Sequence, residues 1–196
     1  IRRPPRSTLF PYTTLCRSDH LCKNVLINHS KNFLLNHFAV SNENGYAMLN
    51  VLDDDQYGAF NSIIDITHQK VSSAPAHIEK TRVIKVDTYF DLFNITKPSL
   101  IKIDVEGLEK QVLEGMQILL TEPYAPCLIL EVCEDTHKNN QNSVQDLLEY
   151  LGKFNYHLFS PDNKGNLTPF VLGKSLNCIA LKQDHFHQLV DRKIHY

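Results

Sequence analysis

A chain of 196 residues, of which 42% are hydrophobic, can bury one sizeable core, so we expect a single main domain. The formal net charge of −2 comes from mixed acidic and basic residues rather than a basic stripe, which argues against nucleic acid as a partner. No apolar run approaches the ~20 residues that cross a bilayer, and the first residues lack the apolar core of a signal peptide, so we expect a cytoplasmic protein without a membrane partner.

The first 18 residues differ in composition from the rest of the chain. The segment IRRPPRSTLFPYTTLCRS contains four Arg and neither Lys nor Asn, whereas Lys dominates downstream. It resembles translated sequencing-adapter sequence, apart from Cys16 in place of an aromatic residue. We therefore expect residues 1–18 to be non-native or disordered, and residues 19–196 to form a partial domain. A genuine basic arm that is disordered or binds an acidic surface is the alternative interpretation.

The next part of the chain predicts two short strands and a long loop. Residues 23–35 carry scattered apolar positions and indicate a weak helix or an irregular segment. A buried strand over 38–41, a polar turn over 42–45 and a second strand over 46–51 together predict a hairpin. Residues 53–76 are polar, with scattered Ile, and predict a long loop with at most one helical turn.

Strands and helices then alternate. The pattern predicts a strand over 82–86, a short helix over 88–93 and a strand over 100–105. Gly107 opens a helix that Pro123 ends. Its apolar positions recur at helical spacing: Leu108, Val112, Leu113, Met116, Leu119 and Leu120.

The last part of the chain continues this alternation. A buried strand over 127–134 precedes an amphipathic helix that begins after a Ser143 cap. Two final strands, 156–159 and 176–181, have no helix between them and should be antiparallel. Apolar strands that alternate with amphipathic helices are typical of parallel strands covered on both faces, so the fold class is α/β.

Two carboxylates at the end of the run LIKIDVEG indicate a site. Burying an ionised carboxylate is costly unless it is paired, so packing alone rarely explains a strand that ends in Asp104 and Glu106. In open α/β sheets ligands bind beyond the carboxyl ends of the strands, where Glu131 of the next predicted strand also lies. If the two strands are parallel neighbours, these side chains converge on one crevice. Alternatively, Asp104 and Glu106 only cap the helix that Gly107 opens.

The same residues carry a family resemblance. LIKIDVEGLEKQVLEGM followed by CLILEV is similar to the signature of the FkbM-type S-adenosylmethionine-dependent methyltransferases. NHFAVSNENGYAMLNV, VIKVDTYFDLF and FNYHLFSPDNKGNL resemble flanking parts of that family, so the likeness covers about residues 24–181. It implies a partial Rossmann-like methyltransferase fold with a mostly parallel sheet and an antiparallel C-terminal strand pair.

One family feature is missing from the sequence. Members begin with a strand and a glycine-rich turn that holds the methionine part of the cofactor, but the first glycine here is Gly45. The resemblance therefore implies a chain that lacks the first strand and this turn. We expect such a truncated chain to be inactive.

The resemblance also implies roles for individual residues. The reaction would transfer a methyl group from S-adenosylmethionine to a hydroxyl oxygen of a sugar or small molecule. Asp104 would orient or deprotonate that hydroxyl, and we expect burial to raise the pKa of Asp104, with Lys102 pointing away from it. Glu106 and Glu131 would hold substrate hydroxyls or, as the less favoured alternative, help to place a divalent metal.

Further residues complete the predicted site. By analogy, Ala39, Val40 and Ser41 would line the cofactor together with Asp104, while Asn61 and Ser62 would border the acceptor pocket. No metal ligand set is predicted.

Two other function classes stay open. The chain could be a non-catalytic α/β fragment or binding module whose carboxylates cap helices. A nucleotide-sugar glycosyltransferase is a lesser alternative, because its DxD-like metal motif is matched only by the DDD at residues 53–55, in the predicted loop.

Overall fold

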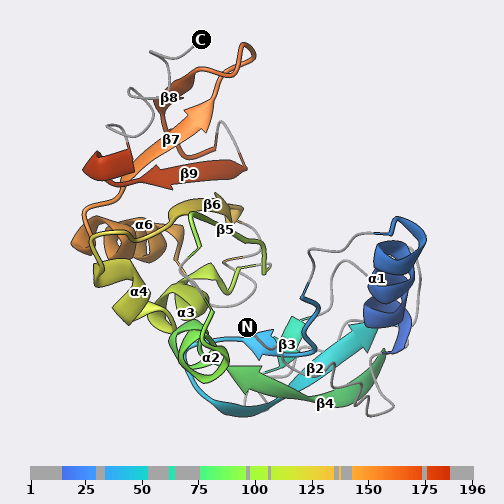
Figure 1. Ribbon diagram of the computed structural model, residues 1–196. Helices are drawn as coiled ribbons and strands as arrows, with labels where there is room; N and C mark the ends of the chain where they lie inside the picture. Colours follow the sequence, from blue (N-terminus) through green and yellow to red (C-terminus); the bar gives the residue numbers. More distant parts are fainter. Residues whose placement is uncertain are drawn as a thin grey trace. The chain divides into compact units, whose positions relative to one another are not determined.

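The computed structural model describes residues 15–29, 34–52, 62–64, 76–95, 98–105, 107–134, 137, 143–173 and 176–185 (Figure 1). The chain forms two compact units. One comprises Ile1–Phe38 and Ala47–Thr81, and the other comprises Ala39–Tyr46 and Arg82–Tyr196. The run Asp53, Asp54 and Asp55 lies outside the described residues, as does most of the segment 1–18.

Helix α1 (Leu15–Ile27) and three strands account for the described regular structure up to residue 84, apart from the short strand β1 (Ala39–Val40). The strands are β2 (Gly45–Leu52), β3 (Ser62–Ile64) and β4 (Ala76–Ile84). Strand β3 lies inside the segment predicted as a loop, so that part of the prediction is wrong. Three residues are too few to give a readable alternation of apolar and polar positions.

The predicted hairpin is also wrong. The sheet order is β1-β4-β2-β3, and β1 pairs in parallel with β4, with Ala39 opposite Val83. Strand β4 lies between β1 and β2, so the connecting turn does not join two paired strands, and its side chains bind elsewhere. Asn42 donates to Glu114 at 2.9 Å, and Asn44 both accepts from the backbone N–H of Lys85 (2.9 Å) and donates to Thr88 (3.0 Å).

The larger unit contains a five-stranded sheet in the order β5-β6-β9-β7-β8. Its strands are β5 (Leu100–Ile103), β6 (Cys127–Glu131), β7 (His157–Pro161), β8 (Leu167–Pro169) and β9 (Asn177–Leu181). Strands β5 and β6 are parallel, whereas β6–β9, β7–β9 and β7–β8 are antiparallel. The antiparallel closing pair is confirmed, but a mostly parallel sheet is not found among the described strands.

Three helices of this unit pack on one face of its sheet. They are α3 (Glu109–Glu114), α4 (Gln117–Thr121) and α6 (Val144–Lys153) (Figure 1). Along β6, Leu128 and Leu130 are fully buried, while Ile129 between them is only half-buried. The sequence predicted helices on both faces of the sheet, whereas in the described part of the chain these three helices cover one face. The core that they share with the strands includes Ile103, Val112, Leu113, Met116, Leu120, Leu128, Leu130, Leu147, Leu151, Cys178 and Ala180.

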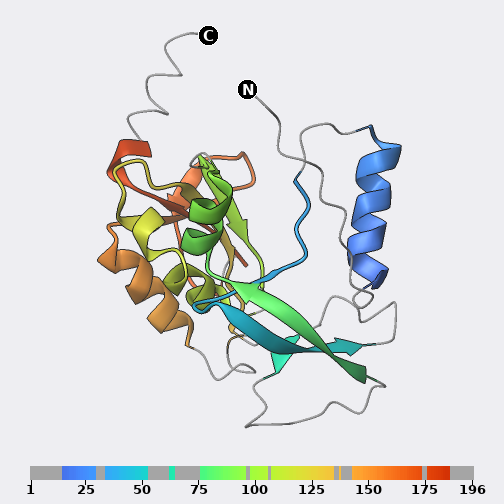
Figure 2. The ribbon, with the colours of Figure 1, turned by 60° about the horizontal axis from the view of Figure 1, so that its bottom comes forward.

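The predicted helix over 107–123 is interrupted. Helix α3 ends at Glu114, with Gly115 as its C-cap, and α4 begins at Gln117. Asp87, in the first turn of α2 (Val86–Phe93), accepts hydrogen bonds from the N–H groups of Ile118 and Leu119, so it caps α4 from another helix. Helix α2 accordingly lies beside α4 in both ribbon views (Figure 1, Figure 2).

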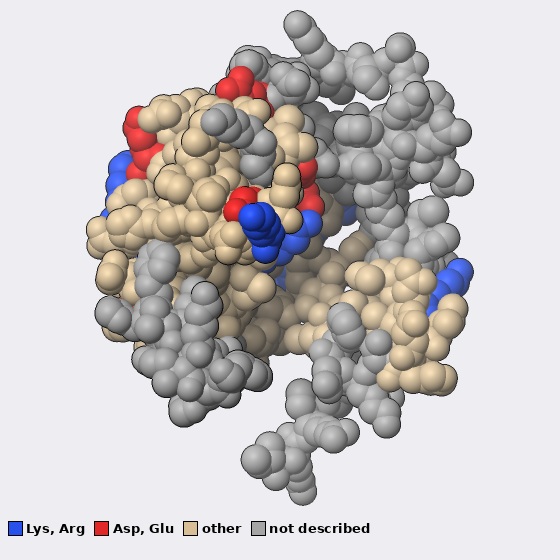
Figure 3. Space-filling model, turned by 90° about the horizontal axis from the view of Figure 1, so that it is seen from above, with Lys and Arg blue, Asp and Glu red and all other residues tan. Residues whose placement is uncertain are grey.

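Helix α6 follows the prediction closely. The Ser143 hydroxyl accepts a hydrogen bond from the N–H of Asp146 and caps the helix, whose buried face carries Val144, Leu147 and Leu151. None of the helices in the described part of the chain is long and apolar enough to span a membrane. On the face shown in Figure 3, described acidic and basic side chains lie close together, and neither sign forms a continuous patch there.

Candidate functional site

The site is built on the two parallel strands β5 and β6. Their register places Ile103 opposite Leu130, so the next residues, Asp104 and Glu131, lie side by side at the carboxyl ends of the strands. The expected neighbour relation is therefore confirmed. Since ligands of open α/β sheets bind at this edge, the two carboxylates lie where a site is expected.

Lys102 belongs to the same cluster. Its Nζ lies 2.6 Å from Asp104 Oδ2, with 59% of the Lys102 side chain and 40% of the Asp104 side chain exposed. The prediction that Lys102 points away is wrong, because residues two apart on a strand project from the same face. The predicted rise in the pKa of Asp104 is also wrong. The hydrogen bond from Lys102, followed by contact with Glu131, holds the pKa of that carboxyl below its ordinary value, and burial opposes this only partly.

The reciprocal effect is found on the lysine. The hydrogen bond to Asp104 and the charge of that carboxylate raise the pKa of Lys102 above its ordinary value. Asp104 is therefore an ionised hydrogen-bond acceptor at neutral pH, beside a protonated lysine. This arrangement favours binding and orienting a hydroxyl over abstracting its proton before the reaction begins.

A buried carboxylate shapes the turn that follows Asp104. Glu109 Oε1 accepts hydrogen bonds from the N–H groups of Val105 and Gly107, each at 3.2 Å. Gly107 has a φ of 95°, in the left-handed region that glycine tolerates best, which explains a glycine at this point. The N–H groups of Val105 and Gly107 are thus satisfied by Glu109, a residue that the sequence analysis did not select. Glu106 lies outside the described residues.

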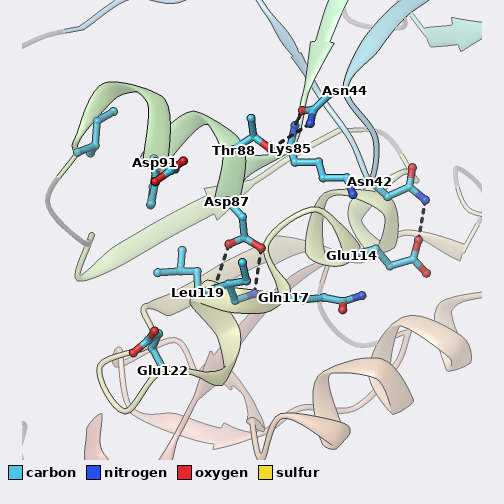
Figure 4. A pocket seen from close by; sticks show the side chains of 13 residues that line it. Asn42, Asn44, Lys85, Asp87, Thr88, Asp91, Glu114, Gln117, Leu119 and Glu122 are labelled. Carbon is cyan, nitrogen blue, oxygen red and sulfur yellow. Dashed lines mark hydrogen bonds between the residues drawn. The ribbon is translucent and has the colours of Figure 1, made fainter.

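A polar cleft of about 910 Å³ lies where α2, α3 and α4 meet (Figure 4). Its side chains largely bind one another: Asn42 bonds to Glu114, Asn44 to Thr88, and Asp87 to the start of α4. Sequence analysis missed this cleft because its residues are dispersed from 42 to 122. Most of its polar groups serve as helix caps and tethers, so its walls have a structural role.

Comparison with known families decides the class of the chain. A family model described as "Methyltransferase FkbM domain" matches residues 5–158, which include Asp104 and Glu131. The chain belongs to the FkbM methyltransferase family. A comparison with curated proteins found no significant match, and a comparison with solved structures found none either.

The other residues predicted for the site of this FkbM chain are Ala39, Val40, Ser41, Asn61 and Ser62. Ala39 and Val40 form β1, and the N–H of Ser41 donates to the carbonyl of Ile84 at 3.3 Å. Ser62 begins β3 and pairs through its backbone with Asn50, but its side chain is not described. Asn61 lies outside the described residues.

Metal ligands are a separate question for this FkbM chain. Within the part of the chain that the structure describes, no group of three or more His, Cys, Asp or Glu side chains is placed to hold a metal ion.

Of the residues predicted for the site, the structure brings together Asp104 and Glu131. It adds Lys102 and Glu109, and the remaining predicted site residues stay predictions.

Proposed function

We propose that the protein is an S-adenosylmethionine-dependent O-methyltransferase that acts on a hydroxyl group of a sugar or another small molecule. The observation that supports this proposal is the pairing of Asp104 and Glu131 at the carboxyl ends of adjacent parallel strands. Membership of the FkbM methyltransferase family supports methyl transfer in general. Oxygen as the methylated atom is inferred from the carboxylates, which accept hydrogen bonds from hydroxyl groups.

Methyl transfer from S-adenosylmethionine is compatible with a carboxylate, here Asp104, that accepts hydrogen bonds and is ionised at neutral pH. S-adenosylmethionine supplies a methyl group on a positively charged sulfur, and carboxylate oxygens suit the surroundings of such a cation. The acceptor hydroxyl must approach this methyl group in line, so a fixed hydrogen bond to Asp104 would align its lone pair. When bound, the donor would supply this methyl group with its sulfur as the leaving group, and the methylated oxygen would then be strongly acidic. Asp104 would take the proton of that oxygen, although the pKa of this carboxyl is below its ordinary value.

The other residues have supporting roles in this proposal. Glu131, beside Asp104, would accept hydrogen bonds from further hydroxyls of the substrate, and Glu106 would do the same. Ala39, Val40 and Ser41 would line the adenine end of the methyl donor. Asn61 and Ser62 would border the acceptor.

Isothermal titration calorimetry of this chain with S-adenosylmethionine separates the proposal from a non-catalytic binding module. Micromolar binding supports a donor site in this chain. The absence of heat favours the binding module, whose carboxylates serve only the fold. S-adenosylhomocysteine, which lacks the sulfonium charge, provides the matched control ligand.

The role of Asp104 is tested in a family member that contains the glycine-rich turn. Changing the residue that matches Asp104 to Asn should lower turnover by about 100-fold or more, because the neutral amide is a weaker acceptor and cannot take the proton. Affinity for the methyl donor should change little. The same Asp→Asn change at the position that matches Asp162, in the turn before β8, is the control. Retained turnover in the first variant would remove Asp104 from the reaction.

A further inference from the structure

Two ionisable side chains behind the site are almost completely buried. Glu109 and His137 are each 1% exposed. Burying such groups costs stability unless their contacts compensate. Neither residue has a part in the proposed methyl transfer, so their contacts need a separate explanation.

Glu109 holds the turn between β5 and α3. One carboxylate oxygen, Oε1, accepts both the N–H of Val105 and the N–H of Gly107 at 3.2 Å. Val105 follows Asp104 directly, and Gly107 lies three residues after it. Hydrogen bonds from backbone N–H groups to a buried carboxylate are among the stronger ones in proteins, so Glu109 fixes the path of the chain as it leaves Asp104.

His137 connects this turn to the segment after β6. Its Nδ1 lies 2.8 Å from the carbonyl oxygen of Cys133, two residues beyond Glu131. A carbonyl oxygen can only accept, so Nδ1 carries a hydrogen. The other ring nitrogen, Nε2, lies 3.3 Å from Glu109 Oε2.

The contact between His137 and Glu109 requires a proton. Among the described residues, neither Nε2 nor Oε2 forms a hydrogen bond with any partner, each other included, although the two atoms lie within ion-pair distance. Two bare lone pairs would repel each other at this distance in a buried place. A proton on the nitrogen or on the oxygen removes this repulsion, so the contact joins the turn after β5 to the segment after β6.

We propose that Glu109 and His137 are positioning residues: they form a buried latch that holds the turn after β5 against the segment after β6 and so keeps Asp104 beside Glu131. Asp104 begins the first of these segments, and Glu131 is the last residue of β6, directly before the second. The purpose of the latch in catalysis rests on the proposed function, but its existence does not.

Amide hydrogen exchange of the ¹⁵N-labelled chain tests the latch directly. In the native protein the amides of Val105 and Gly107 should exchange slowly. Glu109→Ala removes their acceptor and should speed their exchange by about 10- to 100-fold relative to the amide of Ile179 in β9, which reports unfolding of the whole unit. Glu109→Gln is the matched control, because its amide oxygen still accepts and its NH₂ group can donate to His137.

The titration of Asp104, followed through its carboxyl carbon, measures the positioning itself. Lys102 and Glu131 face this carboxyl and hold its pKa below the ordinary value. If the latch sets their spacing, Glu109→Ala should move the pKa of Asp104 upward, whereas Glu109→Gln should not. Asp162→Ala should also leave it unchanged. Asp162 accepts two backbone N–H groups in the turn before β8, so its loss is an equivalent change elsewhere.

Three results would overturn the proposal. They are fast exchange of the Gly107 amide in the native chain, an unprotonated His137 Nδ1 in ring ¹⁵N spectra, and an unchanged Asp104 titration in Glu109→Ala. If Glu109→Ala does not fold, His137→Ala replaces it, because this variant leaves the acceptor of the turn intact and breaks the contacts of the ring with Glu109 and Cys133. No measurement uses a methyl donor, so a failure of the proposed function would leave these results unaffected.

Discussion

Replacing Gly115 by Ala should destabilise the larger unit through a collision with Ser41. Gly115 has φ −80° and ψ −2°, which alanine adopts readily, so the effect is steric rather than conformational. A Cβ at this position would lie 2.0 Å from the carbonyl oxygen of Ser41, about 1.4 Å short of ordinary contact at 3.4 Å. The neighbour is backbone and cannot swing aside as a flexible side chain can.

The expected magnitude follows from two opposing effects. Overpacking costs about 1–3 kcal/mol, while the reduced freedom of the unfolded chain returns about 0.4–1 kcal/mol. The free energy of unfolding should therefore fall by about 1–2 kcal/mol, measured by urea denaturation with far-ultraviolet circular dichroism. Because Ser41 directly follows β1 and donates to the carbonyl of Ile84, the amide resonances of Ser41 and Ile84 should shift as well.

Gly152→Ala is the matched control. Gly152 lies in α6, and a Cβ there would meet nothing within 4 Å. The same substitution should therefore stabilise the protein by about 0.4–1 kcal/mol. If Gly115→Ala proved as stable as Gly152→Ala, the close approach of Ser41 to α3 would be refuted.

Three further predictions concern single contacts. Asp87→Ala removes the acceptor at the start of α4 and should lower the free energy of unfolding by about 1 kcal/mol in urea, whereas an unchanged midpoint would contradict the cap. Tyr156→Phe removes the buried hydrogen bond to the carbonyl of Pro126 (2.7 Å) and should lower the free energy of unfolding by about 1–2 kcal/mol in the same assay. An unchanged free energy of unfolding would show that this hydroxyl has no role in stability. Burial raises the pKa of the Cys178 thiol from 9.0 to about 12, so the unfolded chain loses this proton first. Stability should therefore fall as the pH rises from about 9 towards 12, and more steeply than in Cys178→Ala; parallel pH profiles would refute this.

The spacing of apolar residues predicted those helices and strands whose stability depends on burying one apolar face of their own. Helix α6 and strand β6 were found because Leu147, Leu151, Leu128 and Leu130 recur at helical or strand spacing. The failures arose where distant residues decide the structure. The predicted hairpin is absent because β4 pairs between β1 and β2. The residues that connect these two strands include Asn42, which binds Glu114, 72 residues away.

The candidate site was predicted in part for the same reasons. Asp104 and Glu131 could be selected because the carboxyl ends of parallel strands meet at one edge of a sheet. Lys102 was misjudged, although its position two residues before Asp104 places it on the same face. Glu109 was missed because a carboxylate in the first turn of a helix normally faces solvent. Its spacing of two residues after Gly107 was the available signal.

Helix α4 depends on structure formed far away in the chain. It has five residues, and isolated helices shorter than about 12–15 residues are marginal in water. Its first hydrogen bond goes to a carboxylate 31 residues earlier, so the intervening chain must close into a loop before the cap exists. Residues 117–121 are therefore stabilised as a helix by the docking of α2, and α4 depends on contacts with distant parts of the chain more than on its own sequence.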